Sequence, residues 1–266
     1  MNILFFGDIV GKIGRKALAQ TLPGLKKRFK PDLILANGEN LAHGKGLTPK
    51  VVKEVLKTGV DYLTSGNHFF SREETEEVLE ENLPVIRPAN FPLSLPGEGS
   101  AIISKDGDKI LLINLLGRTF IENEKTILSH PFFKAQEILS NFSEIKIKII
   151  DFHAEATSEK NALAHWLDGK VSLIVGTHTH IQTSDEKILA EGTAFITDLG
   201  MVGALDSVLG MVKEHSIDYL LGETEKFKIE IPEKGRSLVQ GVFTLINETT
   251  GKAEKIERIN EEVIID

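Results

Sequence analysis

Short apolar runs alternate with amphipathic stretches along this chain of 266 residues, and that alternation constrains the fold more than any other feature. Apolar runs bounded by glycine or polar clusters are typical of buried strands. Such runs lie at residues 3–6, 33–36, 62–64, 145–152 and 171–175. Between them, Thr48 and Pro49 provide an N-cap and a first helical position, and a helix from about Gly14 is predicted to be interrupted at Pro23.

Two other regions predict antiparallel strands without helices between them. Residues 102–103 and 110–114 flank the turn sequence Asp106-Gly107 and predict a hairpin. Near the end of the chain, strands are expected at residues 227–231, 239–246 and 253–258. Strand–helix units followed by antiparallel strands predict a layered α/β sandwich. We expect residues 1–266 to form one domain, since no linker or repeat divides the sequence.

Composition excludes several classes of function. The 39 acidic and 31 basic side chains give a net charge of −8, which argues against a protein that coats nucleic acid or an anionic membrane. Cysteine is absent, so disulfides, thiolate metal sites and cysteine nucleophiles are excluded. No apolar stretch is long enough to span a bilayer, and no targeting leader is apparent, so we expect a cytoplasmic protein.

Polar side chains with metal-binding chemistry follow the predicted strands. They are Asp8, Glu39, Asn67, His153, His178 and His180. Roughly thirty residues separate the first three, which is the length of one strand–helix–strand unit. Because the carboxyl ends of parallel strands meet at one edge of a sheet, where such folds bind ligands, these side chains are expected to converge.

The sequence Gly176-Thr-His-Thr-His180 carries the sharpest signal. Histidines two apart in an extended chain point the same way, so His178 and His180 are predicted to share one face as metal ligands. Taken alone, Gly7-Asp8 is more typical of a turn than of a ligand, and Glu39 is as compatible with a solvated turn as with a functional site. Together, carboxylates, amides and imidazoles without sulfur suit manganese, iron or zinc. Four positive charges against two carboxylates and a hydroxide would leave a surplus that favours two ions and an anionic phosphodiester.

The order of these motifs resembles that of the calcineurin-like metallophosphoesterases. The shared motifs are Gly7-Asp8, Gly38-Glu39-Asn40, Gly66-Asn67-His68, His153 and Gly176-x-His178-x-His180. The segments NGENLAHGKGLT, SGNHFF, RPANFP, LLGRTF, DFHAEATSEK, VGTHTHIQT and ITDLGM resemble the YmdB-type bacterial branch more narrowly. The resemblance implies an αββα sandwich and a cytoplasmic homo-oligomer.

The resemblance also implies a metal-dependent phosphodiesterase with two ions per chain, iron or manganese before zinc. Its expected substrates are small cyclic nucleotides, 2′,3′-cyclic AMP first and 3′,5′-cyclic AMP as a further candidate. The nucleophile would be a hydroxide that bridges the two metals. No membrane partner and no stable complex with large nucleic acids are expected. Two rival functions remain open: a nucleotide-binding regulator with little turnover, and a phosphomonoesterase or nuclease of the same superfamily.

Roles follow from the resemblance position by position. Asp8 and His180 would bind the first metal, Glu39 would bridge, and the second site would comprise Asn67, His153 and His178. Asn40 would bind metal or phosphate. The ring of His68, adjacent to a ligand, is expected to act as general acid on the leaving alkoxide. His43 and Arg118 are candidates for substrate contact. Two departures from the wider superfamily are Val10, where many members have histidine, and Glu39, where aspartate is more usual.

Overall fold

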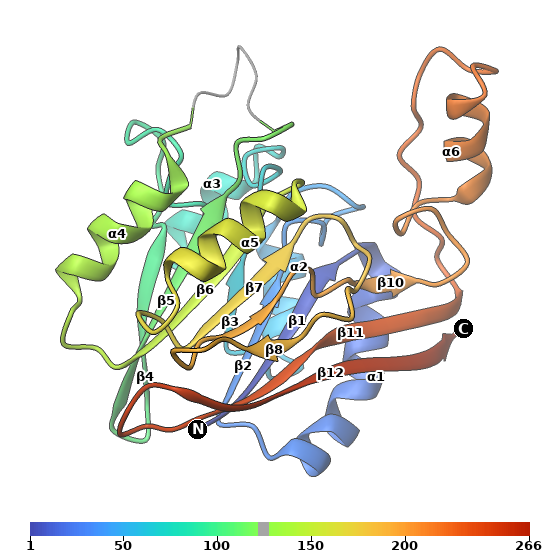
Figure 1. The fold of residues 1–266 in the computed structure, drawn as a ribbon. Coiled ribbons are helices and arrows are strands. Elements are labelled where there is room, and N and C mark those ends of the chain that lie inside the picture. The colour runs from blue at the N-terminus through green and yellow to red at the C-terminus, as the bar shows by residue number, and fades with distance from the viewer. Residues whose placement is uncertain (122–127) are drawn as a thin grey trace.

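The computed structural model describes residues 1–121 and 128–266, which form two six-stranded sheets (Figure 1). The first sheet contains, in spatial order, β12 (Ala253–Ile265), β11 (Gly235–Ile246), β10 (Met201–Ala204), β1 (Asn2–Ile9), β2 (Leu33–Asn37) and β3 (Tyr62–Thr64). The second contains β4 (Ser100–Lys105), β5 (Asp108–Leu116), β6 (Ile147–His153), β7 (Leu173–Thr177), β9 (Ala194–Ile196) and β8 (Lys187–Ile188).

Parallel pairings form the centre of each sheet and antiparallel pairings lie toward the edges, except that the first sheet ends at β3 in a parallel pairing. β1 pairs in parallel with β2, which pairs in parallel with β3, while β5, β6, β7 and β9 run parallel in the second sheet. β11 and β12 form a long antiparallel ribbon, and β4 pairs with β5 as the predicted hairpin. The carboxyl ends of β1, β2, β6 and β7 therefore reach the same side of the molecule, where the ligand candidates lie (Figure 1).

Helices cover the outer faces of the two sheets, and one further helix lies apart from them. They are α1 (Gly11–Phe29), α2 (Pro49–Leu56), α3 (Thr75–Glu80), α4 (Pro131–Asn141), α5 (Thr157–Trp166) and α6 (Lys213–Leu220). The first three pack on the β1 sheet and α4 and α5 on the β6 sheet, while residues 205–234, which include α6, project from the sandwich as an arm (Figure 1). No helix in the described part of the chain has the length and apolar character that crossing a bilayer requires.

Alternating strand residues build the core in layers. Along β1, Ile3 and Phe5 point between the two sheets, whereas Leu4 and Phe6 point toward α1. This alternation follows from the two-residue period of a strand and buries both faces of β1. The predicted layered α/β sandwich is thus confirmed. One apolar layer lies between the two sheets, and one lies between each sheet and the helices that cover it.

Two sequence-based expectations about elements were wrong. Helix α1 continues through Pro23, which lies on its exposed side, because Leu18, Leu22 and Leu25 pack into the core and outweigh the lost hydrogen bond. Residues 227–231 form no strand. The apolar side chain of Ile231 in this segment packs against Gly44 instead. The contact is so close that a Cβ on Gly44 would come within 2.7 Å of the Ile231 side chain.

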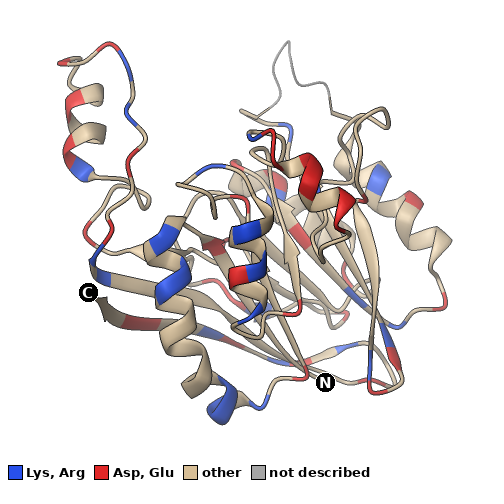
Figure 2. Cartoon of the chain, turned by 180° about the vertical axis from the view of Figure 1, so that it is seen from behind, with Lys and Arg blue, Asp and Glu red and all other residues tan. Residues whose placement is uncertain are grey.

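The outer helices of the β1 sheet carry charged side chains on their exposed faces. Figure 2 shows lysine and arginine along α1 and α2 and acidic residues on α3. The layer between the sheets is built from apolar side chains except close to the ligand candidates, where buried polar groups gather. The buried charges of this protein are therefore concentrated at one edge of the sheets.

Candidate metal centre

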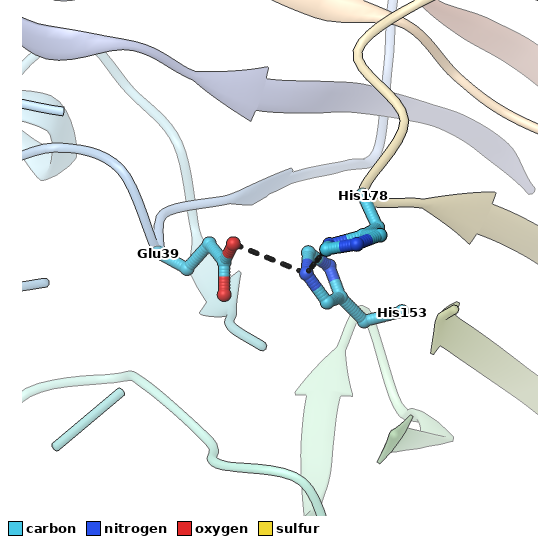
Figure 3. Close-up of side chains that lie close together, drawn as sticks. All are labelled: Glu39, His153 and His178. Carbon is cyan, nitrogen blue, oxygen red and sulfur yellow. Dashed lines mark hydrogen bonds and ion pairs between the residues drawn. The ribbon is translucent and has the colours of Figure 1, made fainter. Parts of the chain in front are cut away.

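Both sheets contribute side chains to a single cluster. The β1 sheet supplies Asp8, near the end of β1, and Glu39, two residues after β2; the β6 sheet supplies His153, the last residue of β6, and His178, directly after β7. One ligand atom from each of Glu39, His153 and His178 lies within 4.8 Å of the other two (Figure 3). The predicted convergence at the strand ends is observed.

The Nε2 atom of His153 is the centre of this cluster. It lies 3.1 Å from Oε1 of Glu39, 3.1 Å from Oδ1 of Asn67 and 3.0 Å from Nδ1 of His178. The dashed lines in Figure 3 mark two of these contacts. One nitrogen cannot satisfy three such neighbours with a single proton, whereas a cation bound among them can.

The other nitrogen of His153 fixes the tautomer of the ring. Nδ1 lies 2.8 Å from Oγ1 of Thr177, whose hydroxyl donates to Oδ1 of Asp151 at 2.7 Å. Because that hydroxyl hydrogen is already used, Oγ1 must accept from Nδ1–H of His153. Thr64 and Asn37 donate to the second oxygen of Asp151. The chain thus presents the lone pair of Nε2 to the cluster, as in metal-binding histidines.

His178 and His180 do not point the same way, contrary to the sequence-based expectation. Their backbone φ angles are +102° and +64°, so the chain turns instead of remaining extended. Nε2 of His178 lies 2.9 Å from Oε2 of Glu155, to which it donates, so its Nδ1 lone pair faces His153. Nδ1–H of His180 donates to the Leu209 carbonyl oxygen at 2.9 Å, leaving Nε2 free.

Asp8 and His180 form a second pair of facing groups. Nε2 of His180 lies 3.9 Å from Oδ1 of Asp8, and two metal–ligand bonds of about 2.1 Å each could span that distance. Oδ1 of Asp8 is fully buried and has no hydrogen-bond partner among residues 1–121 and 128–266, while Oδ2 accepts the backbone N–H of His178. A buried carboxylate oxygen without a donor is costly, and a bound cation would compensate its charge.

The pKa values show how strongly the groups interact. Burial would lower the pKa of His153, but the neighbouring Glu39 carboxylate raises it to about 9. Burial would raise the pKa of Glu39, and His153 instead holds it well below its usual range. Burial raises the pKa of Asp8 to about 6 and lowers that of His178 to about 3. In the metal-free protein, protonated His153 therefore compensates the negative charge of the Glu39 carboxylate.

The donor set fits the divalent metal ions that the fold implies. Its atoms are Oδ1 of Asp8, Oε1 of Glu39, Oδ1 of Asn67, Nε2 of His153, Nδ1 of His178 and Nε2 of His180. Oxygen and imidazole nitrogen without sulfur suit manganese, iron and zinc. Hydrogen bonds to Thr177, Glu155 and the Leu209 carbonyl orient the three rings, which is the outer support typical of metal sites.

His68 and Asn40 lie next to this cluster. The backbone N–H of His68 donates to Oε2 of Glu39 at 3.1 Å, and burial lowers the pKa of its ring. Asn40 donates from Nδ2 to the Gly44 carbonyl oxygen at 3.0 Å, and its buried Oδ1 has no partner within the described ranges. His68 therefore contacts Glu39 through its backbone N–H, and its imidazole is not used in that hydrogen bond.

The two remaining site candidates occupy different places. His43 lines a cavity of about 320 Å³ together with Lys12 and residues 229–233 of the arm, so it faces the arm. Arg118 follows Gly117, whose backbone N–H donates to the His153 carbonyl oxygen at 2.9 Å. Arg118 is half-buried at the same sheet edge as the ligand candidates, and its backbone N–H donates to Glu159.

The buried polar groups that support the ligand candidates are not among the residues predicted from the sequence. Asp151, Thr177 and Asn37 lie inside apolar strands, where their polarity is the available signal. Asp151 and His153 are two apart on β6, so both point to the same face, and that spacing could have identified the carboxylate as a partner of the imidazole. Asp198, which accepts hydrogen bonds from Thr179, was missed in the same way.

Comparison with known proteins identifies close relatives. Residues 4–259 match the family model described as "YmdB-like protein". The 2′,3′-cyclic-nucleotide 2′-phosphodiesterase of Bacillus subtilis (strain 168) is 43% identical over 265 residues, covering 97% of this chain and 96% of that protein. A crystal structure described as a novel phosphatase from Mycoplasma pneumoniae has a TM-score of 0.91 and 34% identity, covering 100% of this chain and 94% of its own.

A more distant likeness concerns the fold alone. The NAD nucleotidase of Haemophilus influenzae aligns with a TM-score of 0.62 at 16% identity. The alignment covers 100% of this chain and 56% of the nucleotidase. The two-sheet architecture is therefore shared with larger nucleotide-hydrolysing proteins.

Proposed function

Since the chain belongs to the YmdB-like family and is an enzyme of phosphodiester hydrolysis, we propose that it hydrolyses cyclic nucleotides with two bound metal ions. The first candidate substrate is 2′,3′-cyclic AMP, because the Bacillus subtilis relative is named for that substrate class and matches nearly the whole chain. Activity on 3′,5′-cyclic AMP is a second candidate from the same substrate class.

The orientation of the ring nitrogens carries this proposal. His153, His178 and His180 each donate one N–H to a protein oxygen and leave the other nitrogen facing a carboxylate or another imidazole. Such an arrangement supports cation binding at two places, one near Glu39 and one near Asp8. When bound, the metal ions would withdraw charge from the phosphoryl oxygens and lower the pKa of water, the attacking group.

The residues of the chain then have separable tasks. The two carboxylate oxygens of Glu39 have separate contacts, Oε1 with Nε2 of His153 and Oε2 with the backbone N–H of His68, and Glu39 is the candidate bridging carboxylate. The His68 ring is the candidate general acid for the departing ribose oxygen. A phosphodiester anion beside the ring would raise the pKa of His68, which opposes the lowering by burial. Asn40 and Arg118 are candidates for contact with the phosphate.

A panel of substrates tests the proposal. Metal-free protein is supplemented with Mn²⁺ or Fe²⁺ and assayed on 2′,3′-cyclic AMP, 3′,5′-cyclic AMP, a phosphomonoester and single-stranded RNA. We expect metal-dependent turnover of the 2′,3′-cyclic nucleotide above all. Faster hydrolysis of the monoester or RNA would favour the rival phosphatase or nuclease, and tight nucleotide binding without turnover would favour the regulator.

Matched variants assign the activity to this site. Glu39→Gln removes the candidate bridge with little change in volume and should abolish nearly all turnover. Glu76→Gln, on the exposed surface of α3, makes the same chemical change away from the site and should leave activity unchanged. Near-normal activity of Glu39→Gln would overturn the assignment.

Two expectations about the cellular state of the protein remain proposals. We propose a homo-oligomer, to be measured by light scattering of the purified protein. We also propose a cytoplasmic location, to be tested by fractionating cells that produce it. The proposed partners are small cyclic nucleotides, without a membrane or a stable large nucleic acid.

A further inference from the structure

A buried ion pair lies beneath the loop that carries His178 and His180. Nζ of Lys160, on α5, lies 2.7 Å from Oδ2 of Asp198, and the two side chains are 1% and 0% exposed. Neither residue belongs to the ligand set. A fully buried ion pair is costly to desolvate and is a weak source of stability, so its presence next to a site calls for another explanation.

Thr179 connects this pair to the two histidines. Its backbone N–H and its hydroxyl both donate to Oδ2 of Asp198, at 3.1 and 2.8 Å. The same oxygen also accepts from Lys160, so three donors converge on it. Oδ1 of Asp198 accepts the backbone N–H of Gly200 at 2.9 Å. The residue between the two histidines is thus attached to the protein through one carboxylate.

The backbone on either side of Thr179 is in a region that non-glycine residues rarely adopt. The φ angles of His178 and His180 are +102° and +64°. Such conformations persist only where surrounding contacts determine them, and they turn the two rings in different directions. His178 consequently faces His153, and His180 faces Asp8. Without an attachment at Thr179, the loop would be free to relax toward extended conformations, in which the rings share one face.

We propose that Lys160 and Asp198 are positioning residues that act through Thr179 to hold His178 and His180 in the conformation that binds both metals. This inference rests on the proposed metal-dependent function. It adds that the three donors on Asp198 determine metal affinity without any contact to the metals. Lys160 and Asp198 are buried, and both carboxylate oxygens of Asp198 accept hydrogen bonds. These contacts therefore hold the loop in its metal-binding conformation before a metal ion binds.

Thr179→Val tests the attachment while keeping size and branching. The variant loses the hydroxyl donor, whereas Thr179→Ser retains it. Thr193→Val is the control for loss of a threonine hydroxyl, since the hydroxyl of the buried Thr193 also donates to a protein oxygen, that of the Val171 carbonyl, at the opposite end of the β7–β9 pair from the partly buried Thr179. Mn²⁺ binding to each metal-free protein is followed by electron paramagnetic resonance, and thermal unfolding is recorded with and without Mn²⁺.

We expect Thr179→Val to bind Mn²⁺ about 10- to 100-fold more weakly, as is usual when an outer support is lost, and to gain less thermal stability from Mn²⁺. Thr179→Ser should restore the affinity. Thr193→Val should reduce the unfolding temperature without changing Mn²⁺ affinity. A second variant, Lys160→Met, should also weaken Mn²⁺ binding in the fraction that remains folded.

Two outcomes separate this inference from the proposed function. Wild-type affinity for Mn²⁺ in Thr179→Val, or equal weakening in Thr179→Ser, would overturn the positioning role while leaving the proposed function intact. If the wild-type protein bound neither Mn²⁺ nor Fe²⁺ nor Zn²⁺, the proposed function itself would fail.

Discussion

The contact between Glu39 and His153 predicts that the metal-free protein loses stability at alkaline pH. Burial opposes protonation of His153, but Glu39 outweighs it and raises the pKa of the ring from an ordinary 6.5 to about 9. A group whose pKa is raised on folding contributes full stability below its unfolded pKa. That contribution is lost as the pH rises through the folded pKa. The loss should therefore fall between pH 6.5 and about 9.

The size of the effect follows from the gap between the two pKa values. Each pH unit of difference corresponds to about 1.4 kcal/mol, so the protonated ring contributes on the order of 3 kcal/mol. The pKa of Asp8 is shifted to about 6 and that of His178 to about 3, so these two groups change the pH dependence of stability only below pH 6.5. An effect of that size is a substantial fraction of the stability of an ordinary domain.

Urea unfolding of chelator-treated protein at several pH values from 6.5 to 9.5 measures this loss directly. Wild-type stability should fall across the series, whereas Glu39→Gln should be nearly flat because its neutral amide no longer raises the pKa of His153. A wild-type curve that is flat over the same range would refute the reasoning. So would an equal fall in Glu39→Gln, since the raised pKa would then not come from Glu39.

Three further predictions concern individual side chains. Asp8→Asn should lose chiefly the metal held with His180, which elemental analysis would detect as about one equivalent per chain in place of about two. Thr177→Val removes the acceptor of the His153 Nδ1 proton and should weaken Mn²⁺ binding about 10- to 100-fold, measured by equilibrium dialysis. His68→Ala should keep both metals but lose roughly 10²–10⁴-fold in turnover of 2′,3′-cyclic AMP. The loss should be smaller for an aryl phosphodiester whose leaving group needs no proton, and equal losses on both substrates would contradict general acid catalysis.

Much of the architecture could be predicted from local patterns. The strand at residues 62–64 is a short apolar run with clear boundaries, and Thr48 caps α2 as its hydroxyl predicts. The apolar run at 171–175 also predicts a strand, which in the structure is shifted by two residues to Leu173–Thr177. Pro23 and residues 227–231 could not be interpreted locally, because packing of leucines in one case and of Ile231 in the other decided the outcome. Local propensity is a weak guide where tertiary contacts are strong.

The ligand candidates were predictable as a set, but their geometry was not. The motif positions of Asp8, Glu39 and His153 at strand ends bring them together in the structure. The turn at His178 and His180 depends on contacts with Asp198 and with the Leu209 carbonyl oxygen, both distant in sequence. A two-residue spacing therefore indicated which residue types are present, while long-range hydrogen bonds determined where the rings point.

The division of the ligand candidates between two sheets has a consequence for ion preference. Hydrogen bonds make each sheet stiff, so the separation between the carboxylates on one and the imidazoles on the other depends on the layer between them. That layer consists of side chains such as Phe5 and Val175, together with the hydrogen bond from Asn37 to Asp151. Metal ions differ in preferred bond length by a few tenths of an ångström, from about 2.1 Å for magnesium to about 2.4 Å for calcium. An ion bound among these groups would therefore meet a spacing that is determined in part by the volume of apolar side chains that never touch it.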